Sequence, residues 1–214
     1  EDGLILDDGV TFRIDETTWL LHSSTGAADR VHHHIEMILN VHRPDLDVAL
    51  VPVTSAWANA TVCGPKAREV LAALALDFDS APQSFPFMAM REGKVAGLPA
   101  RVFRVSWTGE LSFEINTEPH LAVEMWSRIL AAGALFGIAP IGSEANHILR
   151  VEAGYISTGH EVDGTADVID LGLGGMVSAV KRDFIGKRSM DLRRAADPVR
   201  AELVGLLPAD PYAS

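Results

Sequence analysis

The stretch Trp107-Thr-Gly-Glu-Leu-Ser-Phe-Glu-Ile-Asn116 has the residue alternation of a half-buried β-strand. Apolar and polar side chains alternate from Leu111 to Asn116, which predicts one face toward a core and one polar face. The pair Thr108-Gly109 just before it permits a sharp bend. Glu114 falls on the polar face, where a carboxylate fits either a solvated sheet surface or the lining of a binding site. The alternation alone leaves both interpretations open.

Short strand and helix patterns follow one another on both sides of this stretch. Hairpin-like spacings dominate, and few long strand-helix-strand crossovers occur, so we predict an α+β fold with mixed, mainly antiparallel sheets and packed helices. Asp7-Asp8-Gly9 is a turn signal between two of the strands. The other expected strands cover residues 4–6, 10–14, 18–22, 47–54, 58–63, 94–98 and 100–106; the expected helices cover 26–42, 64–74, 117–133 with Thr117 as cap, 143–153 and 187–195.

Composition limits the classes of function. The chain has 214 residues and 48% hydrophobic content, enough to bury a core, and its formal net charge of -11 argues against nucleic acid and anionic membranes as partners. The single cysteine, Cys63, excludes an internal disulfide and fits a cytoplasmic location. No apolar run approaches the roughly 20 residues of a membrane span, and no signal peptide is evident.

Both ends of the sequence predict a piece of a longer polypeptide. The chain has no initiator Met and enters a strand pattern almost at once. At the other end, Glu202-Leu-Val-Gly-Leu-Leu207 begins a further apolar run that soon stops.

Two motifs that suggest cofactors or metals are better explained as structure. Leu171-Gly-Leu-Gly-Gly175 has neither the Walker spacing nor a Gly-x-Gly-x-x-Gly helix start, and we interpret it as a tight packing loop. His32-His-His34 cannot share one ligand face, because consecutive helical residues point about 100° apart. We therefore predict a solvated helix surface there and no metal site.

Five motifs, in order along the chain, resemble those of the folate-binding aminomethyltransferase family, which contains the glycine-cleavage T-protein. Among its members, the Trp107 stretch and the segment after Gly154 are most similar to the alpha subunits of heterotetrameric sarcosine oxidases. The motifs are Ile5-Leu-Asp-Asp8, Cys63-Gly-Pro-Lys-Ala-Arg68, Trp107–Ile115, Leu149-Arg-Val-Glu-Ala-Gly154 and Asp183-Phe-Ile-Gly186.

The resemblance implies a one-carbon transfer reaction and the aminomethyltransferase fold. In such an oxidase a flavin oxidises the N-methyl group of sarcosine to an iminium, and the folate region captures the carbon as 5,10-methylenetetrahydrofolate. Tetrahydrofolate is then the cofactor of this chain, FAD and NAD belong to parts outside it, and the partners are the other oxidase subunits and a secondary amine. A stand-alone aminomethyltransferase, a dimethylglycine-oxidase-type enzyme and a non-catalytic folate-binding or assembly module are the alternatives.

The resemblance also assigns residues. Asp8 matches the catalytic aspartate; from the residues alone, Asp7-Asp8 fits either a structural turn or a carboxylate pair suited to acid–base work. Glu114 matches the glutamate that grips the pterin by two parallel N–H bonds. Trp107 replaces a pterin-site tyrosine and keeps a flat face for stacking. Asp7 and Tyr155 complete the expected folate contacts.

One position departs from the family, and three segments are expected. Asn146 stands where the T-protein carries a folate-binding arginine, so the contact with the folate tail must differ or come from another part of the protein. We expect residues 1–80 to form a first α+β subdomain and 81–200 a second one, with the boundary in the proline-containing connector 80–87. Residues 201–214 are expected to begin a C-terminal barrel.

Overall fold

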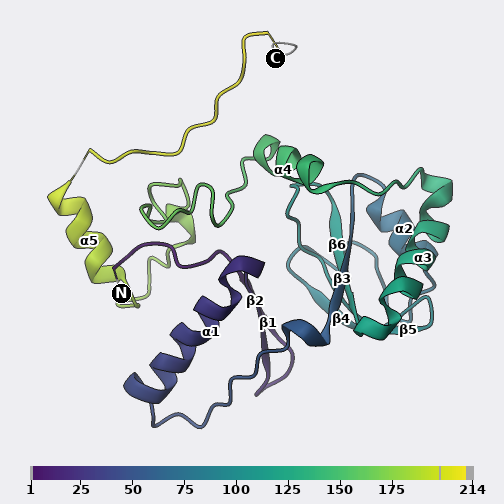
Figure 1. Ribbon diagram of the computed structural model, residues 1–214, viewed down its shortest axis with the longest axis horizontal. Helices are drawn as coiled ribbons and strands as arrows, with labels where there is room; N and C mark the ends of the chain where they lie inside the picture. The colour runs from purple at the N-terminus through teal and green to yellow at the C-terminus, as the bar shows by residue number, and fades with distance from the viewer. Residues whose placement is uncertain (1, 198, 211–214) are drawn as a thin grey trace. The chain divides into compact units, whose positions relative to one another are not determined.

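The computed structural model describes residues 2–197 and 199–210, and the chain forms two compact units. Unit 1 combines residues 1–50 with 156–214, and unit 2 is the continuous segment Val51–Tyr155. Figure 1 shows the elements of each unit in order of colour along the chain.

Unit 2 is built on a four-stranded antiparallel sheet. Its strands are β3 (Ala58–Cys63), β4 (Met90–Val95), β5 (Leu98–Phe103) and β6 (Ser112–Thr117), in the spatial order β3-β6-β5-β4. The strand predicted within Trp107–Asn116 is thus β6, which begins only at Ser112 and is an interior strand flanked by two partners. With its helices, this sheet confirms the α+β class with antiparallel pairing.

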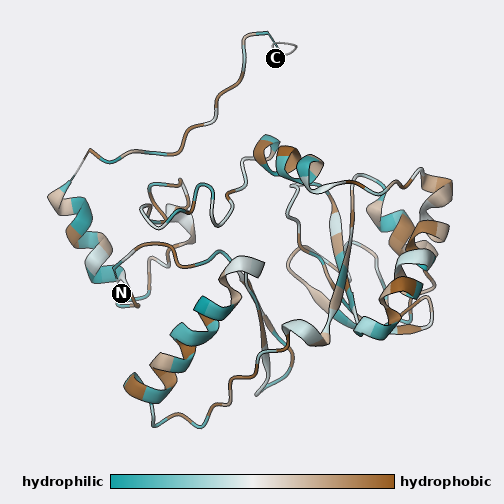
Figure 2. Cartoon of the chain, in the orientation of Figure 1, coloured by the Kyte–Doolittle hydropathy of each residue, from teal (hydrophilic) through white to brown (hydrophobic). Residues whose placement is uncertain are grey.

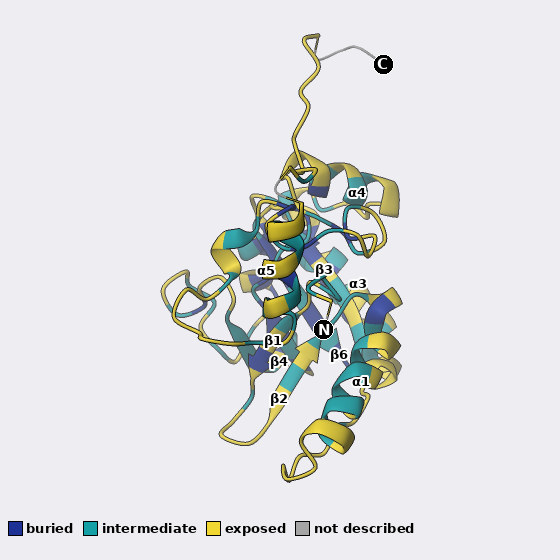
Figure 3. Cartoon of the chain, turned by 90° about the vertical axis from the view of Figure 1, so that its left-hand side faces the viewer, coloured by how far each residue is buried: buried dark blue, intermediate teal, exposed yellow. Residues whose placement is uncertain are grey.

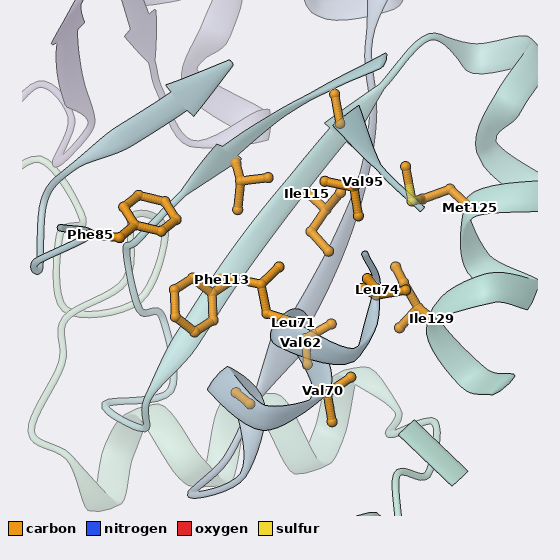
Figure 4. Close-up of a cluster of buried hydrophobic side chains, with 13 residues drawn as sticks. Val62, Val70, Leu71, Leu74, Phe85, Val95, Phe113, Ile115, Met125 and Ile129 are labelled. Atoms are coloured by element: carbon orange, nitrogen blue, oxygen red, sulfur yellow. The ribbon is translucent and has the colours of Figure 1, made fainter. Parts of the chain in front are cut away.

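The alternation along β6 places the core on one face of the sheet. Phe113 and Ile115 are completely buried there. Helices α2 (Ala67–Ala73) and α3 (Ala122–Gly133) supply further apolar side chains to the same core (Figure 4). Burial of this apolar surface is the main stabilising contribution of unit 2. Other buried members of the core are Val62, Val70, Leu71, Leu74, Phe85, Val95, Met125 and Ile129.

Several boundaries in unit 2 differ from those predicted. The hairpin between β4 and β5 turns at Ala96-Gly97, where both residues have the positive φ values (51° and 83°) of a tight hairpin turn. The predicted strands 94–98 and 100–106 placed this turn later, near residue 99. Thr117 does not cap α3; its hydroxyl donates to the Pro99 carbonyl at 3.0 Å. Residues 47–53 form no strand, and a 3-10 turn, Thr54–Ala56, follows them.

The helix predicted at 143–153 is α4 (Ser143–Glu152), the last helix of unit 2. Gly154 follows it with φ of 73°, the left-handed conformation expected after a helix C-terminus. The predicted helix end is therefore confirmed.

Unit 1 contains a β-hairpin, but its turn does not lie at Asp7-Asp8-Gly9. Residues 4–6 form no strand, and the hairpin pairs β1 (Val10–Arg13) with β2 (Trp19–His22). The turn is closed by Asp15, whose Oδ1 accepts the backbone N–H groups of Thr17 and Thr18, both at 2.8 Å. An aspartate that bonds the backbone two and three residues ahead is a strong turn former, and this explains why the hairpin shifts along the chain.

The described part of unit 1 also contains two α-helices. A 3-10 turn, Thr25–Ala27, leads into α1 (Ala28–Met37), a π-helical turn, Ile38–His42, follows it, and α5 is Lys187–Ala196. None of the residues of α1 is buried, and Figures 2 and 3 show its mixed polar and apolar, mainly exposed and intermediate surface. No helix in the described part of the chain is long and apolar enough to cross a bilayer.

The unit boundaries do not coincide with the predicted subdomain boundary near residue 80. β3 precedes that connector and β6 follows it, yet the two strands pair along their whole length, so one sheet spans the predicted boundary. Residues 199–210 form no helix or strand, and the Leu203 amide donates to the Asp170 carbonyl at 2.8 Å. The expected barrel at 201–214 stays a prediction, and residues 211–214 lie outside the described residues.

Candidate functional site

Glu114 lies on the face of β6 opposite the core. Its direct partners in the sheet are Thr61 on β3 and Phe103 on β5, and Asn116 follows it on the same face. We call this surface the Glu114 face; it also includes Asn59 and Arg101, which both stand opposite Asn116.

Burial raises the pKa of Glu114, because a low-dielectric surrounding disfavours the charged carboxylate. A hydrogen bond with Asn59 lowers it in part. A second polar group on the face, the amide nitrogen of Asn116, is buried and has no hydrogen-bond partner among the described residues. The face thus combines a desolvated acceptor with an unused polar group, an arrangement suited to a polar heterocycle.

Trp107 lies in the loop between β5 and β6. Gly109 in this loop has φ of 79°, which confirms the predicted bend. A Cβ at Gly109 would lie 2.4 Å from the Ala153 Cβ, so the loop packs closely against the end of α4. The Trp107 ring meets His147 of α4 edge to face, with centroids 6.5 Å apart.

Tyr155 lies just after α4 and is 40% exposed. Its backbone is fixed by Arg150, whose carbonyl accepts the Tyr155 N–H at 2.8 Å and whose Nη1 donates to the Tyr155 carbonyl at 3.0 Å. Tyr155 also acts electrostatically on Arg104, whose pKa is lowered by burial and by the charge of Arg68. Asn146, the departure from the family arginine, lies on α4 one turn before Arg150.

Asp7 and Asp8 belong to unit 1 and form a cluster with two hydroxyl residues. The backbone N–H of Ser24 donates to both oxygens of Asp7, at 3.3 and 3.2 Å. The hydroxyls of Ser24 and Thr158 lie 3.1 and 3.2 Å from Asp8 Oδ1. Asp7 is half-buried and Asp8 exposed. We call these four residues the Asp8 cluster.

The predicted site residues therefore fall into two groups. Asp7 and Asp8 lie together in unit 1, whereas Glu114, Trp107 and Tyr155 belong to unit 2. The polar partners of these residues, namely Ser24, Thr158 and Asn59, were not predicted. For Asn59 a signal existed, because it is on the polar side of the predicted strand 58–63.

Unit 1 contains a second acidic pair, which was not predicted from the sequence. Asp167 and Asp170 are 0% and 5% exposed. Arg200 donates to Asp170 with two nitrogens, at 2.7 and 2.5 Å, and these bonds lower the pKa of Asp170 to about 2. Burial raises the pKa of Asp167, but Arg194 and backbone amides outweigh it, so the net direction is downward. Because arginines pair with both carboxylates, we interpret this group as a network that stabilises the fold.

No cluster of three or more His, Cys, Asp or Glu side chains within residues 2–197 and 199–210 could hold a metal ion.

Comparisons with known proteins give one consistent family. The sequence profile of the GCVT N-terminal domain matches residues 1–181. The sarcosine oxidase subunits alpha of Corynebacterium sp. (strain U-96) and Rhizobium meliloti (strain 1021) are 40% and 39% identical over 98% and 100% of this chain. An aminomethyltransferase of Corynebacterium aurimucosum is 34% identical over 97% of the chain.

This chain is short relative to these proteins. It spans 22% of the length of the two oxidase subunits and 55% of the aminomethyltransferase. A solved structure, the heterotetrameric sarcosine oxidase from Corynebacterium sp. U-96 in complex with pyrrole 2-carboxylate, matches with 17% sequence identity and a TM-score of 0.44, over 58% of each chain. The family profile covers most of the sequence, and the chain therefore belongs to the GCVT N-terminal domain family.

Proposed function

We propose that this chain is the folate-binding portion of a sarcosine oxidase alpha subunit and transfers the one-carbon unit of oxidised sarcosine to tetrahydrofolate. The observation that carries the proposal is Glu114, a half-buried carboxylate on an interior strand whose pKa is raised by desolvation, with no cation among the groups that shift it. Support also comes from the 40% identity to an oxidase subunit alpha and from the family itself.

Glu114 suits the pyrimidinone edge of a pterin. That edge presents two parallel N–H donors, and a carboxylate accepts both with its two oxygens. Such bonds replace the hydration that Glu114 loses on burial, so a ligand of this shape restores part of the cost of placing a carboxylate there. The flat indole of Trp107, fixed against His147, offers a stacking surface for the same kind of ring.

Asp8 suits the proton transfer. When bound, tetrahydrofolate supplies two nitrogens that together take up the iminium carbon, and its two N–H protons are given up: one goes to the departing amine and one leaves as H⁺. Asp8 is exposed and can accept the released proton, and its negative charge stabilises an approaching iminium. The iminium itself comes from oxidation by a flavin, which we place outside this chain together with the other oxidase subunits.

Tetrahydrofolate binding to the chain is the first test. We expect saturable binding by isothermal titration calorimetry that is lost in Glu114→Ala. Equal binding by both proteins would contradict the role of Glu114. If the chain binds folate but the assembled enzyme forms methylenetetrahydrofolate equally well without it, the chain is a binding module instead.

The transfer step is tested in the assembled oxidase. We expect Asp8→Asn to sustain sarcosine oxidation while methylenetetrahydrofolate falls and free formaldehyde rises. The source of the one-carbon unit distinguishes the alternative. A stand-alone aminomethyltransferase would be active with a glycine-cleavage system and inactive with the oxidase subunits.

A further inference from the structure

The carboxylate of Asp8 is contacted on one side only. The Oγ of Ser24 and the Oγ1 of Thr158 lie 3.1 and 3.2 Å from the same oxygen, Oδ1. Among the residues that the structure describes, the other oxygen, Oδ2, accepts no hydrogen bond. Asp8 thus has one oxygen held by the protein and one available to a ligand.

The hydroxyl protons of the Asp8 cluster are consistent with one bonded and one available oxygen on Asp8. The Ser24 and Thr158 hydroxyls lie 3.2 Å apart, and each has a single proton to donate. Asp7 already receives the Ser24 backbone N–H, and its Oδ1 is 3.4 Å from Thr158 Oγ1, a longer distance than that to Asp8. Both hydroxyl protons can therefore be directed to Asp8 Oδ1.

Both hydroxyls are carried by backbone that is fixed by hydrogen bonds. Ser24 opens the 3-10 turn before α1, where its carbonyl accepts the Ala27 N–H at 2.9 Å. Thr158 lies in a loop closed by the Gly159 amide, which donates to the Val162 carbonyl at 2.9 Å, and Val162 is buried. Asp8 itself lies in no helix or strand, so its orientation depends on these partners.

We propose that Ser24 and Thr158 are positioning residues for Asp8: they hold Oδ1 and leave Oδ2 open to accept the proton that a bound folate would give up. The inference rests on the proposed function, because it takes Asp8 as the proton acceptor. A carboxylate fixed in one orientation needs no reordering before the transfer, and the gain appears in the rate of capture and not in folate affinity. If the hydroxyls only held the loop, their loss would lower stability and leave capture unchanged.

The experiment uses the assembled oxidase with sarcosine and tetrahydrofolate and measures the ratio of methylenetetrahydrofolate to formaldehyde. Thr158→Val keeps the shape and removes the hydroxyl; Ser24→Ala is the second variant, and Thr158→Ser restores the hydroxyl. The matched control is Thr165→Val, which removes a hydroxyl that donates to Asp163 at 2.6 Å in the same unit. Thermal unfolding of each variant shows that it is folded.

We expect Thr158→Val and Ser24→Ala each to lower the ratio about 3- to 10-fold, the size of one hydrogen bond. Half-saturation by tetrahydrofolate should stay within about two-fold, because the folate contacts are unchanged. Thr158→Ser and the control should match the parent enzyme. In an Asp8→Asn background Thr158→Val should have no further effect, since both act through one carboxylate.

Two results overturn the inference by itself. One is a parent-like ratio in Thr158→Val and Ser24→Ala while Asp8→Asn lowers it; the other is a full effect of Thr158→Val in the Asp8→Asn background. An unchanged ratio in Asp8→Asn is a different outcome, since it contradicts the proposed role of Asp8 and the inference together.

Discussion

Glu114 on β6 is hydrogen-bonded to Asn59 on β3, although the residue directly opposite Asn59 in the register is Asn116. The bond therefore runs diagonally across the polar face of the sheet. It offsets the burial of Glu114 only in part, because the pKa remains raised. Asp170 is the contrasting case: it is more deeply buried than Glu114, but two arginines hold its pKa low. The carboxylate of Asp170 is therefore compensated within the fold, whereas the raised pKa of Glu114 is consistent with the proposed contact to a folate.

Replacing Glu114 by Gln should separate stability from binding. The amide keeps the shape and can still bond Asn59, but it removes a charge whose burial is unfavourable. We expect a melting temperature equal to or above that of the parent chain. Tetrahydrofolate affinity should fall about 10- to 100-fold, because one or two charge-assisted hydrogen bonds are lost. Differential scanning fluorimetry and calorimetric titration measure the two quantities, and unchanged affinity would exclude Glu114 as a ligand.

The affinity for tetrahydrofolate should depend on pH through Glu114. Its raised pKa means that it takes up a proton at a higher pH than an ordinary glutamate, and the protonated acid cannot accept two N–H bonds. Affinity should therefore weaken as pH falls through that raised pKa. The same carboxyl disfavours folding as pH rises through this range, since the folded state then carries the buried charge.

Glu114→Gln is the control for this pH dependence, because its amide does not titrate. Its residual affinity should follow only the protonation of the ligand. Parallel pH profiles for the parent chain and Glu114→Gln would show that Glu114 does not titrate on binding.

Local patterns allowed most of the secondary structure to be predicted. The strand at 58–63, the central strand with Glu114, and the helices at 143–153 and 187–195 follow from periods of 2 and 3.6 residues, which depend only on neighbours in sequence. The hairpin of unit 1 was misplaced because Asp7-Asp8-Gly9 and Asp15 both have turn chemistry, and only the pairing of β1 with β2 decides between them.

The partners of the site residues could not be predicted in the same way. Ser24 and Thr158 are 134 residues apart, and no local pattern links them. Glu114 stood out because a carboxylate interrupts an otherwise ordinary strand. Which residue shares its proton or its hydrogen bonds depends on register and loop closure, which are tertiary properties.

Gly9 should be intolerant of any side chain. A Cβ there would lie 2.0 Å from the carbonyl oxygen of His22 and 3.0 Å from Asp7 Oδ2. Gly9→Ala must therefore displace either the end of β2 or Asp7, and we expect a loss of roughly 2 kcal/mol or more in the free energy of unfolding. Gly26→Ala is the matched control, since nothing lies within 4 Å of its added Cβ. Equal stability of both variants in urea denaturation would contradict this close packing.

Asp170→Asn should destabilise unit 1 strongly. Asp170 is 5% exposed and accepts bonds from Arg200 and Arg194, so the substitution leaves Arg200 without its carboxylate and Arg194 with Asp167 alone. Removing one partner of a buried ion pair costs about 3–5 kcal/mol in general, and because Arg194 is 32% exposed we expect the lower end of that range. Asp45→Asn, which breaks an exposed pair with Arg43, is the control and should leave the unfolding midpoint unchanged.

The pH dependence gives this prediction a second readout. The pKa of Asp170 is depressed from its ordinary value of 3.8 to about 2, so the folded state keeps the charge that the unfolded chain loses. Its contribution to stability is complete above pH 3.8 and declines as pH falls toward 2. The difference in free energy of unfolding between the parent chain and Asp170→Asn should therefore narrow over that window. A difference that stays constant from neutral pH down to acid would mean that the lost hydrogen-bond geometry, and not the charge of Asp170, stabilises the network.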